Sequence, residues 1–368
     1  MRTDVASMHA LVSAPVAQTV CSHARREAAV LAGLCVALSA AFVLSLVLGS
    51  THVPIASVID VLLRSSTVDE SSALVIESIR LPRALTAVLA GAALGIAGLQ
   101  MQTLFRNPLA DPFALGISSG ASLGVAIVVL GSGMSVATVF GASTGLAGDA
   151  LLIAAAITGA LAVLAVVLAV SARVANPATV LILGLMFGYT ASAIVTVLVG
   201  ISSPERLMEL ARWGFGSFSG VTWQRLSLFA PVTFVGLGLA AVMTKQLNAL
   251  LLGENYARSM GVAVRRARVL TMLGASMLGA VVTAFCGPIA FLGIAVPHLC
   301  RGLLGTSNHR VLVPAVVLLG GVVALIAQIV SLVPGNAGVL PLNAVTSIIG
   351  APVVVAILLR TRRGAFAA

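Results

Sequence analysis

The sequence predicts an all-α protein that crosses a membrane many times, and three observations support this. The 368 residues are 59% hydrophobic and 9% charged, whereas about 25% of residues are charged in a typical soluble domain. The mean hydropathy is +1.12. Long windows such as 28–49 and 311–332 contain no acidic or basic residue. About 20 mostly apolar residues are enough to cross the roughly 30 Å hydrocarbon core of a bilayer.

Ten apolar windows have about the length that a bilayer requires, so we expect about ten transmembrane helices. The third and the eighth window are short, rich in glycine and flanked by proline, which favours broken or partly re-entrant helices at these two places. The windows are 28–49, 82–103, 113–131, 150–172, 178–200, 225–244, 266–286, 288–304, 311–332 and 343–360.

The distribution of charge predicts the orientation. With the N-terminus inside, fifteen of the 21 Lys and Arg fall in inner segments, and seven of the 11 Asp and Glu fall in outer segments. Cytoplasmic loops carry an excess of Lys and Arg, so both termini are predicted to be cytoplasmic, in a cytoplasmic (inner) membrane. The same rule accounts for the net charge of +10. With only 4% aromatic residues, nucleic-acid binding is not expected.

The chain divides into three parts. Residues 1–27 are predicted to be a poorly ordered cytoplasmic extension, 28–363 a single transmembrane domain, and 364–368 a tail. Within the domain, the inner connection 245–265 has the pattern of short amphipathic helices broken at glycines. The segments 83–98 and 266–281 resemble each other. Five spans in each half would make two inverted repeats, an arrangement common among transporters.

The residues predict no catalytic, metal-binding or cofactor site in this chain. Lys245 is its only lysine and follows no Gly-rich loop, so there is no Walker A motif to bind ATP. His298 and Cys300 are two residues apart, and such positions do not share a helix face. The spans contain mild polar residues in place of the ionisable groups typical of ion-coupled carriers. The sequence therefore argues against an ion-coupled transporter, which is kept as a less favoured alternative function. These polar residues are Gln100, Gln102, Thr283, Gln328 and Asn343.

Two basic residues and one loop stand out from their surroundings. Arg80 and Arg83 flank the start of the second span, where they could anchor the chain at the interface or meet an acidic partner. The stretch "LLGENYARSMGV" (251–262) could be a solvated loop. It also suits a short helix inserted into a groove of a cytosolic partner, with Glu254 and Arg258 paired at i, i+4.

The stretch "LFRNPLADPFALGISSGAS" (104–122) predicts a tight inner turn followed by a closely packed helix. Its prolines end one helix and begin the next, and small residues let helices approach each other in membranes. The residues predicted to form the turn are Arg106, Asn107, Pro108, Asp111 and Pro112.

Four segments together resemble the FecCD-type permeases of type II ABC importers for ferric siderophores, haem and cobalamin. They are "RLPRALTAVLAGAALGIAGLQMQTLFRNPLADPFALGISSGAS" (80–122), "LGENYARSMGVAVRRAR" (252–268), "GPIAFLGIAVPHLCRGLLGTSNHRVLVPAVVLLGG" (287–321) and "IIGAPVVVAILLR" (348–360). The resemblance covers about residues 30–363. It implies ten helices per subunit, a second permease subunit, a cytosolic ATPase dimer that binds ATP and Mg, and an extracytoplasmic binding protein. A ferric siderophore is the leading cargo, and haem and cobalamin are alternatives.

The resemblance also implies roles for particular residues. Arg80 and Arg83 correspond to the arginines that dock the binding protein. The family's coupling helices correspond to Leu252, Gly253, Glu254, Ala257, Arg258 and Gly261, and its inner gate to Asn176, Pro177, Ala178 and Thr179. One position departs from the family: the ninth span has Gln328 where relatives often have an arginine. Since a third docking arginine is then missing, a heterodimer of two different permease chains is favoured over a homodimer.

Overall fold

The computed structural model describes residues 4–49, 53–63, 70–131, 146–171, 173–174, 177–332 and 339–365, and within these ranges every regular element is a helix. Among these described residues, seven helices are long and apolar enough to cross a membrane, and three shorter apolar helices accompany them. The elements are α1 (Asp4–Val47), α2 (Ile55–Leu62), α3 (Glu70–Val75), the π-helix η1 (Ile76–Arg80), α4 (Leu81–Phe105), the 3₁₀ helix η2 (Pro112–Leu115), α5 (Ile117–Gly131), α7 (Leu146–Ser171), α8 (Pro177–Gly200), α9 (Pro204–Gly214), α10 (Trp223–Val242), α11 (Thr244–Leu251), α12 (Glu254–Ser259), α13 (Val264–Cys286), α14 (Leu292–Leu304), α15 (His309–Leu332) and α16 (Leu342–Ala365).

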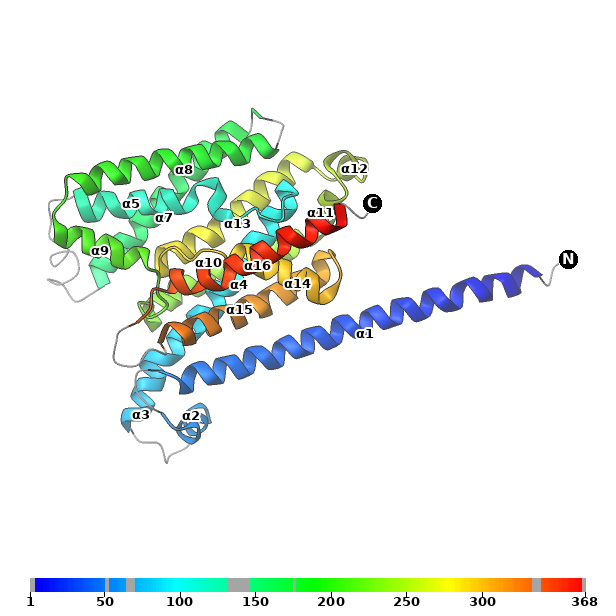
Figure 1. Cartoon of the computed structure of the whole chain (residues 1–368), viewed down its shortest axis with the longest axis horizontal. Helices are drawn as coiled ribbons and strands as arrows, with labels where there is room; N and C mark the ends of the chain where they lie inside the picture. The colour runs from blue at the N-terminus through cyan, green and yellow to red at the C-terminus, as the bar shows by residue number, and fades with distance from the viewer. Residues whose placement is uncertain are drawn as a thin grey trace.

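Helix α4 lies at the centre of the bundle and contacts α10, α13, α14 and α15 (Figure 1). Helices α5, α7, α8 and α9 form a layer on one side, and α1 lies along α15 on the other. Eleven of the 25 residues of α4 are Ala, Gly or Thr, and the helix is buried along nearly its whole length. Such a helix suits the centre because its neighbours can approach its backbone from every side.

Short apolar helices lie at the predicted third and eighth spans. Helix α5 begins only after Gly116, whose φ is 78°, and α14 begins after Gly287 and Phe291, whose φ values are 75° and 68°. A residue with positive φ interrupts a right-handed helix, so the backbone conformation itself sets each helix break. Both α4–α5 and α13–α14 thus consist of a long helix, a break and a short helix. The twofold relation between the two halves remains a prediction.

Helix α1 reaches back into the N-terminal extension. The structure continues α1 back to Asp4, so a helix occupies most of the stretch 1–27 that the sequence led us to expect without order. Residues 4–32 are rich in alanine and contain no glycine, a composition with favourable helix propensity. The second span also starts earlier than expected, because α3, η1 and α4 form one continuous helical run over Glu70–Phe105.

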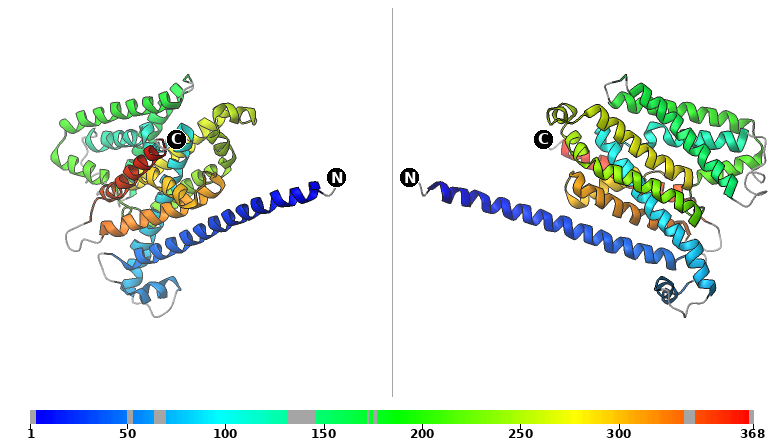
Figure 2. Two further views of the ribbon diagram at one scale, coloured as in Figure 1. Left: turned by 45° about the vertical axis from the view of Figure 1, so that its right-hand side comes forward. Right: turned by 180° about the vertical axis from the view of Figure 1, so that it is seen from behind.

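Helices α11 and α12 mark one end of the bundle, called here the coupling end (Figures 1 and 2). The N-terminal part of α1 and the C-terminal part of α16 point to this same end. Helices α2, α3 and α9 lie at the opposite end. The shared end agrees with the predicted arrangement of the termini, and its cytoplasmic location remains a prediction.

Glycines bring the central helices into backbone contact. A Cβ on Gly91 of α4 would overlap the carbonyl group of Gly320 on α15, and one on Gly98 would overlap Gly293 on α14. A Cβ on Gly120 of α5 would lie 2.6 Å from the carbonyl oxygen of Gly159 on α7. The small residues of the 104–122 stretch therefore do what the sequence predicted, because they allow α5 to pack closely.

We expect Gly91→Val to destabilise the bundle strongly. The added side chain must separate α4 from α15, and overpacking of this kind costs about 1–3 kcal/mol or more. Thermal unfolding of the detergent-solubilised protein, followed by size-exclusion chromatography, should show a transition several degrees lower. Gly238→Val is the matched control, since nothing lies within 4 Å of a Cβ there. Equal stability of the two variants would contradict the close contact between Gly91 of α4 and Gly320 of α15.

Candidate coupling site

The coupling end carries a helical hairpin made of α11 and α12. Gly253 joins them with a φ of 117°, and Gly261 ends the turn after α12 with a φ of 80°. An L-residue with a side chain is strained at such angles, which explains glycine at both predicted break points. A small core under the hairpin consists of Met243, Leu247, Ala249, Leu250, Ala257, Val264 and Ala267.

Glu254 anchors α12 to α13. Its Oε1 accepts a hydrogen bond from Nη2 of Arg268, and its Oε2 lies 3.5 Å from Nη2 of Arg258. The side chains of Glu254 and Arg268 are 27% and 13% exposed, whereas that of Arg258 is 63% exposed. The pair with Arg268 is thus the shielded one. Ala257 is fully buried beneath the same helix, so no larger side chain fits there without displacing α12.

The outer face of the hairpin is apolar. Leu252, Tyr256 and Met260 are 64%, 53% and 58% exposed. Together with Arg258 they present an apolar and basic surface beyond the end of the spans. A surface of this composition suits the groove of a cytosolic partner.

Predicted residues from three separate segments meet at one open groove of about 640 Å³. Its lining includes Arg106 from the turn, Ala178 at the start of α8, and Leu252, Gly253 and Glu254 from the hairpin. Nη2 of Arg106 donates to the carbonyl of Leu250 at 3.3 Å. The turn after α4 therefore supports the hairpin directly, a contact that the sequence did not predict.

The turn itself is held by local hydrogen bonds. Arg106 has a φ of 47°, the left-handed conformation that ends α4. The side chain of Asn107 accepts from the backbone N–H of Leu109, and that of Asp111 accepts from the N–H of Phe113, both at 2.9 Å. Pro112 begins η2, and Pro108 lies within the turn.

The predicted inner-gate residues lie beside this groove. Pro177 begins α8, and Ala178 and Thr179 are exposed in its first turn. Asn176 lies outside the described residues. The gate assignment remains a prediction, and Ala178 is the member that lines the groove with the hairpin.

A buried polar chain that the sequence analysis missed ties the hairpin to the spans. His309 begins α15 and is fully buried. Its Nδ1 lies 2.8 Å from Oδ1 of Asn248 on α11, which also accepts from the backbone N–H of His309 at 2.9 Å. Its Nε2 lies 2.9 Å from Oγ1 of Thr103 on α4. An amide oxygen only accepts, so Nδ1 of the ring carries a hydrogen.

A second buried chain joins α4 to α14. Nη1 of Arg301 donates to Oε1 of Gln102 at 2.6 Å, and Nε2 of Gln102 donates to the carbonyls of Gly293 and Ile294 at 3.2 Å. These carbonyls belong to the first turn of the short helix α14. Gln102, one of the mild polar residues noted in the sequence, therefore stabilises the broken helix.

The predicted docking arginines lie at the opposite end and differ in their environments. Arg80 is 5% exposed, and its Nη1 donates to the carbonyls of Leu46 and Val47 at 2.6 and 2.7 Å. It thus caps the C-terminus of α1. Arg83 is partly exposed, and its Nε has no hydrogen-bond partner among the described residues. Docking remains a prediction for both, and Arg80 would have to leave its carbonyls to take part.

Gln328, the residue behind the heterodimer prediction, is 3% exposed inside α15. Whether the permease dimer contains one kind of chain or two remains a prediction.

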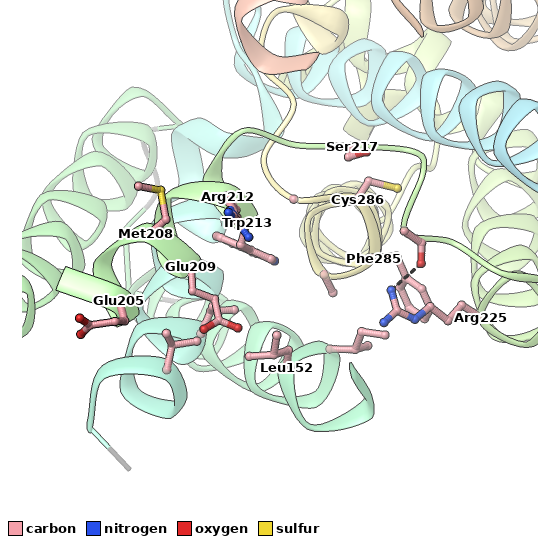
Figure 3. A pocket seen from close by; sticks show the side chains of 16 residues that line it. Leu152, Glu205, Met208, Glu209, Arg212, Trp213, Ser217, Arg225, Phe285 and Cys286 are labelled. Atoms are coloured by element: carbon pink, nitrogen blue, oxygen red, sulfur yellow. Dashed lines mark hydrogen bonds between the residues drawn. The ribbon is translucent and has the colours of Figure 1, made fainter. Parts of the chain in front are cut away.

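The end opposite the coupling end also contains an open pocket of about 610 Å³ between α9 and the ends of α5, α7 and α13 (Figure 3). Glu209 and Arg212 of α9 line one side, and Arg225 lines the other, where its Nη1 donates to the carbonyl of Gly220 at 2.5 Å. Burial raises the pKa of Glu209, and the charge of Arg212 opposes this. None of these residues was predicted from the sequence to belong to a site.

No group of three or more His, Cys, Asp and Glu is placed to hold a metal within the described part of the chain. A bundle of apolar helices with an exposed apolar and basic hairpin at one end is typical of a membrane subunit that docks a partner outside the spans.

Comparison of the sequence with known protein families identifies its family. The FecCD transport family matches residues 37–360, and the chain belongs to this family.

Relatives and a solved structure agree with this membership. The vitamin B12 import permease BtuC of Klebsiella pneumoniae is 39% identical over 78% of this chain and 83% of its own length. The uncharacterised ABC transporter permease YvrB of Bacillus subtilis is 33% identical over 89% of this chain and 92% of its own. A structure described as "An inward-facing conformation of a putative metal-chelate type ABC transporter" matches with a TM-score of 0.77 and 28% identity, over 90% of this chain and 98% of that one.

Proposed function

We propose that this FecCD permease carries a large metal chelate from an extracytoplasmic binding protein into the cytoplasm, with cobalamin as the leading cargo. A ferric siderophore was the leading cargo predicted from the sequence. The similarity to permeases named for vitamin B12 import now favours cobalamin, and ferric siderophores and haem are the alternatives. The chain lies in the cytoplasmic membrane beside a second permease subunit, as its bacterial relatives suggest.

The anchored hairpin is the observation that carries the mechanism. A cytosolic ATPase dimer binds ATP and Mg and contacts the apolar and basic face of α12. Displacement of the hairpin then reaches α13 through Glu254 and Arg268, and reaches α4 and α15 through Asn248 and His309. Because α4 is central, such a displacement opens the pathway alternately to the two sides.

Uptake by the reconstituted complex tests this function. We expect radiolabelled cobalamin to accumulate in proteoliposomes only with ATP inside the hairpin-facing compartment and loaded binding protein on the other side. Vanadate should abolish uptake and uncouplers should not, since the ion-coupled alternative predicts the reverse. Parallel assays with a ferric siderophore and with haem identify the cargo. No uptake of cobalamin, ferric siderophore or haem, or uptake that is sensitive to uncouplers, would contradict the proposal.

The mass of the purified complex tests the dimer. The heterodimer predicted from the sequence requires two different permease chains in one complex. A complex of defined mass that contains only this permease species would exclude it.

A further inference from the structure

A separate pocket of about 630 Å³ lies at the coupling end, between the α10–α11 junction and the start of α13. Its apolar walls come from the ends of two membrane spans, with Val242 on α10 and Leu270 on α13. Met260 closes it from the turn after α12. The pocket thus lies where the apolar spans end and the hairpin begins.

The polar groups of this pocket are basic or neutral. Lys245 and Arg266 line it, and no Asp or Glu is present among its described lining residues. Lys245 follows the end of α10 by three residues, and Arg266 is in the first turn of α13. Gln246 also lines the pocket, and its Oε1 is buried without a hydrogen-bond partner in the described chain. The amide can be placed in either orientation, so it can donate into the pocket.

Apolar surface continues from the pocket along both spans. Val235 on α10 lies seven residues before Val242, on the same helix face, and is 64% exposed. Val269 and Leu273 follow Arg266 at three and seven residues on α13 and are each 37% exposed. A ligand held by the two cations would therefore have an apolar track on which to extend into the bilayer.

We propose that this pocket binds the headgroup of an acidic phospholipid, of which phosphatidylglycerol is the simplest, with its acyl chains along α10 and α13. Basic pockets between membrane helices at the cytoplasmic side suit such headgroups, and each cation near the surface contributes about 1 kcal/mol. The cytoplasmic leaflet follows from the orientation in the proposed function. Since Met260 and Gly261 also line the pocket, the bound lipid supports the loop that carries the coupling hairpin.

The single lysine makes this site directly measurable. An amine-reactive reagent modifies Lys245 and the N-terminal amine only, so the N-terminus is an internal reference. We expect labelling of Lys245, measured by mass spectrometry, to be about fivefold slower in phosphatidylglycerol nanodiscs than in phosphatidylcholine nanodiscs. Arg266→Gln should abolish the difference. Arg265→Gln, which removes the same charge from an exposed neighbour outside the pocket, should retain it.

Further arms distinguish the possible occupants. Inorganic phosphate added to phosphatidylcholine nanodiscs should not protect Lys245. Protection equal to that in phosphatidylglycerol nanodiscs would show that the pocket binds a soluble anion and not the lipid. Protection by the docked ATPase alone would assign the pocket to the partner. Equal protection in the two arginine variants, or no dependence on lipid, would overturn the proposal. Native mass spectrometry of Lys245→Gln, expected to retain fewer phosphatidylglycerol molecules, gives a second readout. None of these measurements requires transport, so failure of the proposed function would leave the test intact.

Discussion

Glu254→Arg is expected to reduce uptake at least tenfold while the protein remains inserted in the membrane. The substitution replaces the acid between Arg258 and Arg268 with a third positive charge. Loss of a partly buried ion pair costs about 2 kcal/mol, between the values for exposed and fully buried pairs. Helix α12 should therefore separate from α13, and loaded binding protein should no longer stimulate ATP hydrolysis. Uptake and ATPase activity in proteoliposomes measure both effects.

Charge reversal provides the control for this variant. The double variant Glu254→Arg with Arg268→Glu restores an opposite-charge pair at the same position, so we expect it to regain much of the uptake. Unchanged uptake in Glu254→Arg, or no recovery in the double variant, would show that this contact does not transmit the displacement.

Asn248→Leu is expected to uncouple hydrolysis from transport, with uptake per ATP reduced at least tenfold. The change removes the acceptor of the His309 ring and backbone N–H, as well as a donor to Asn308. Each hydrogen bond contributes about 1 kcal/mol, and the buried ring group is left unsatisfied. Helix α11 can then move without α4 and α15. The ratio of cargo imported to ATP hydrolysed measures the result.

Asn308→Ser is the matched control for the polar chain. Asn308 accepts the N–H of Arg310 and contacts Asn248 at the exposed side of the chain. Serine keeps a side-chain acceptor at this helix start, and the His309 contacts remain. We expect nearly normal coupling in this variant. An equal loss of coupling in both variants, or normal coupling in Asn248→Leu, would contradict the role assigned to the hydrogen bonds that join Asn248, His309 and Thr103.

The helices and their breaks could be predicted because they depend on nearby residues. Apolar windows place the spans, and the glycines and prolines near 104–122 and 287–291 mark the two breaks. The hairpin was predicted for the same reason, since Gly253 and Gly261 interrupt an amphipathic pattern.

The partners of the polar residues could not be predicted in this way. From the sequence, Glu254 has a suitable neighbour in Arg258, yet its shielded partner is Arg268. For Arg80 the sequence left open an interfacial anchor or a docking residue, and it gave no sign of the two carbonyl groups that the end of α1 offers. In both cases a second helix supplies the contact, and its position is absent from any local pattern.

The sequence by itself determined that this protein is a bundle of apolar helices, where two of them are broken, and which family it belongs to. These features follow from hydropathy, glycine and proline over short stretches of chain. Only the tertiary structure decided how the coupling hairpin is connected. Thr103 and His309 are 206 residues apart, and Asn248 and His309 are 61 apart. The packing of α4 against α15, where glycines let the two backbones touch, brings Thr103 to His309, and the contacts of α11 with both helices bring Asn248 to the same place.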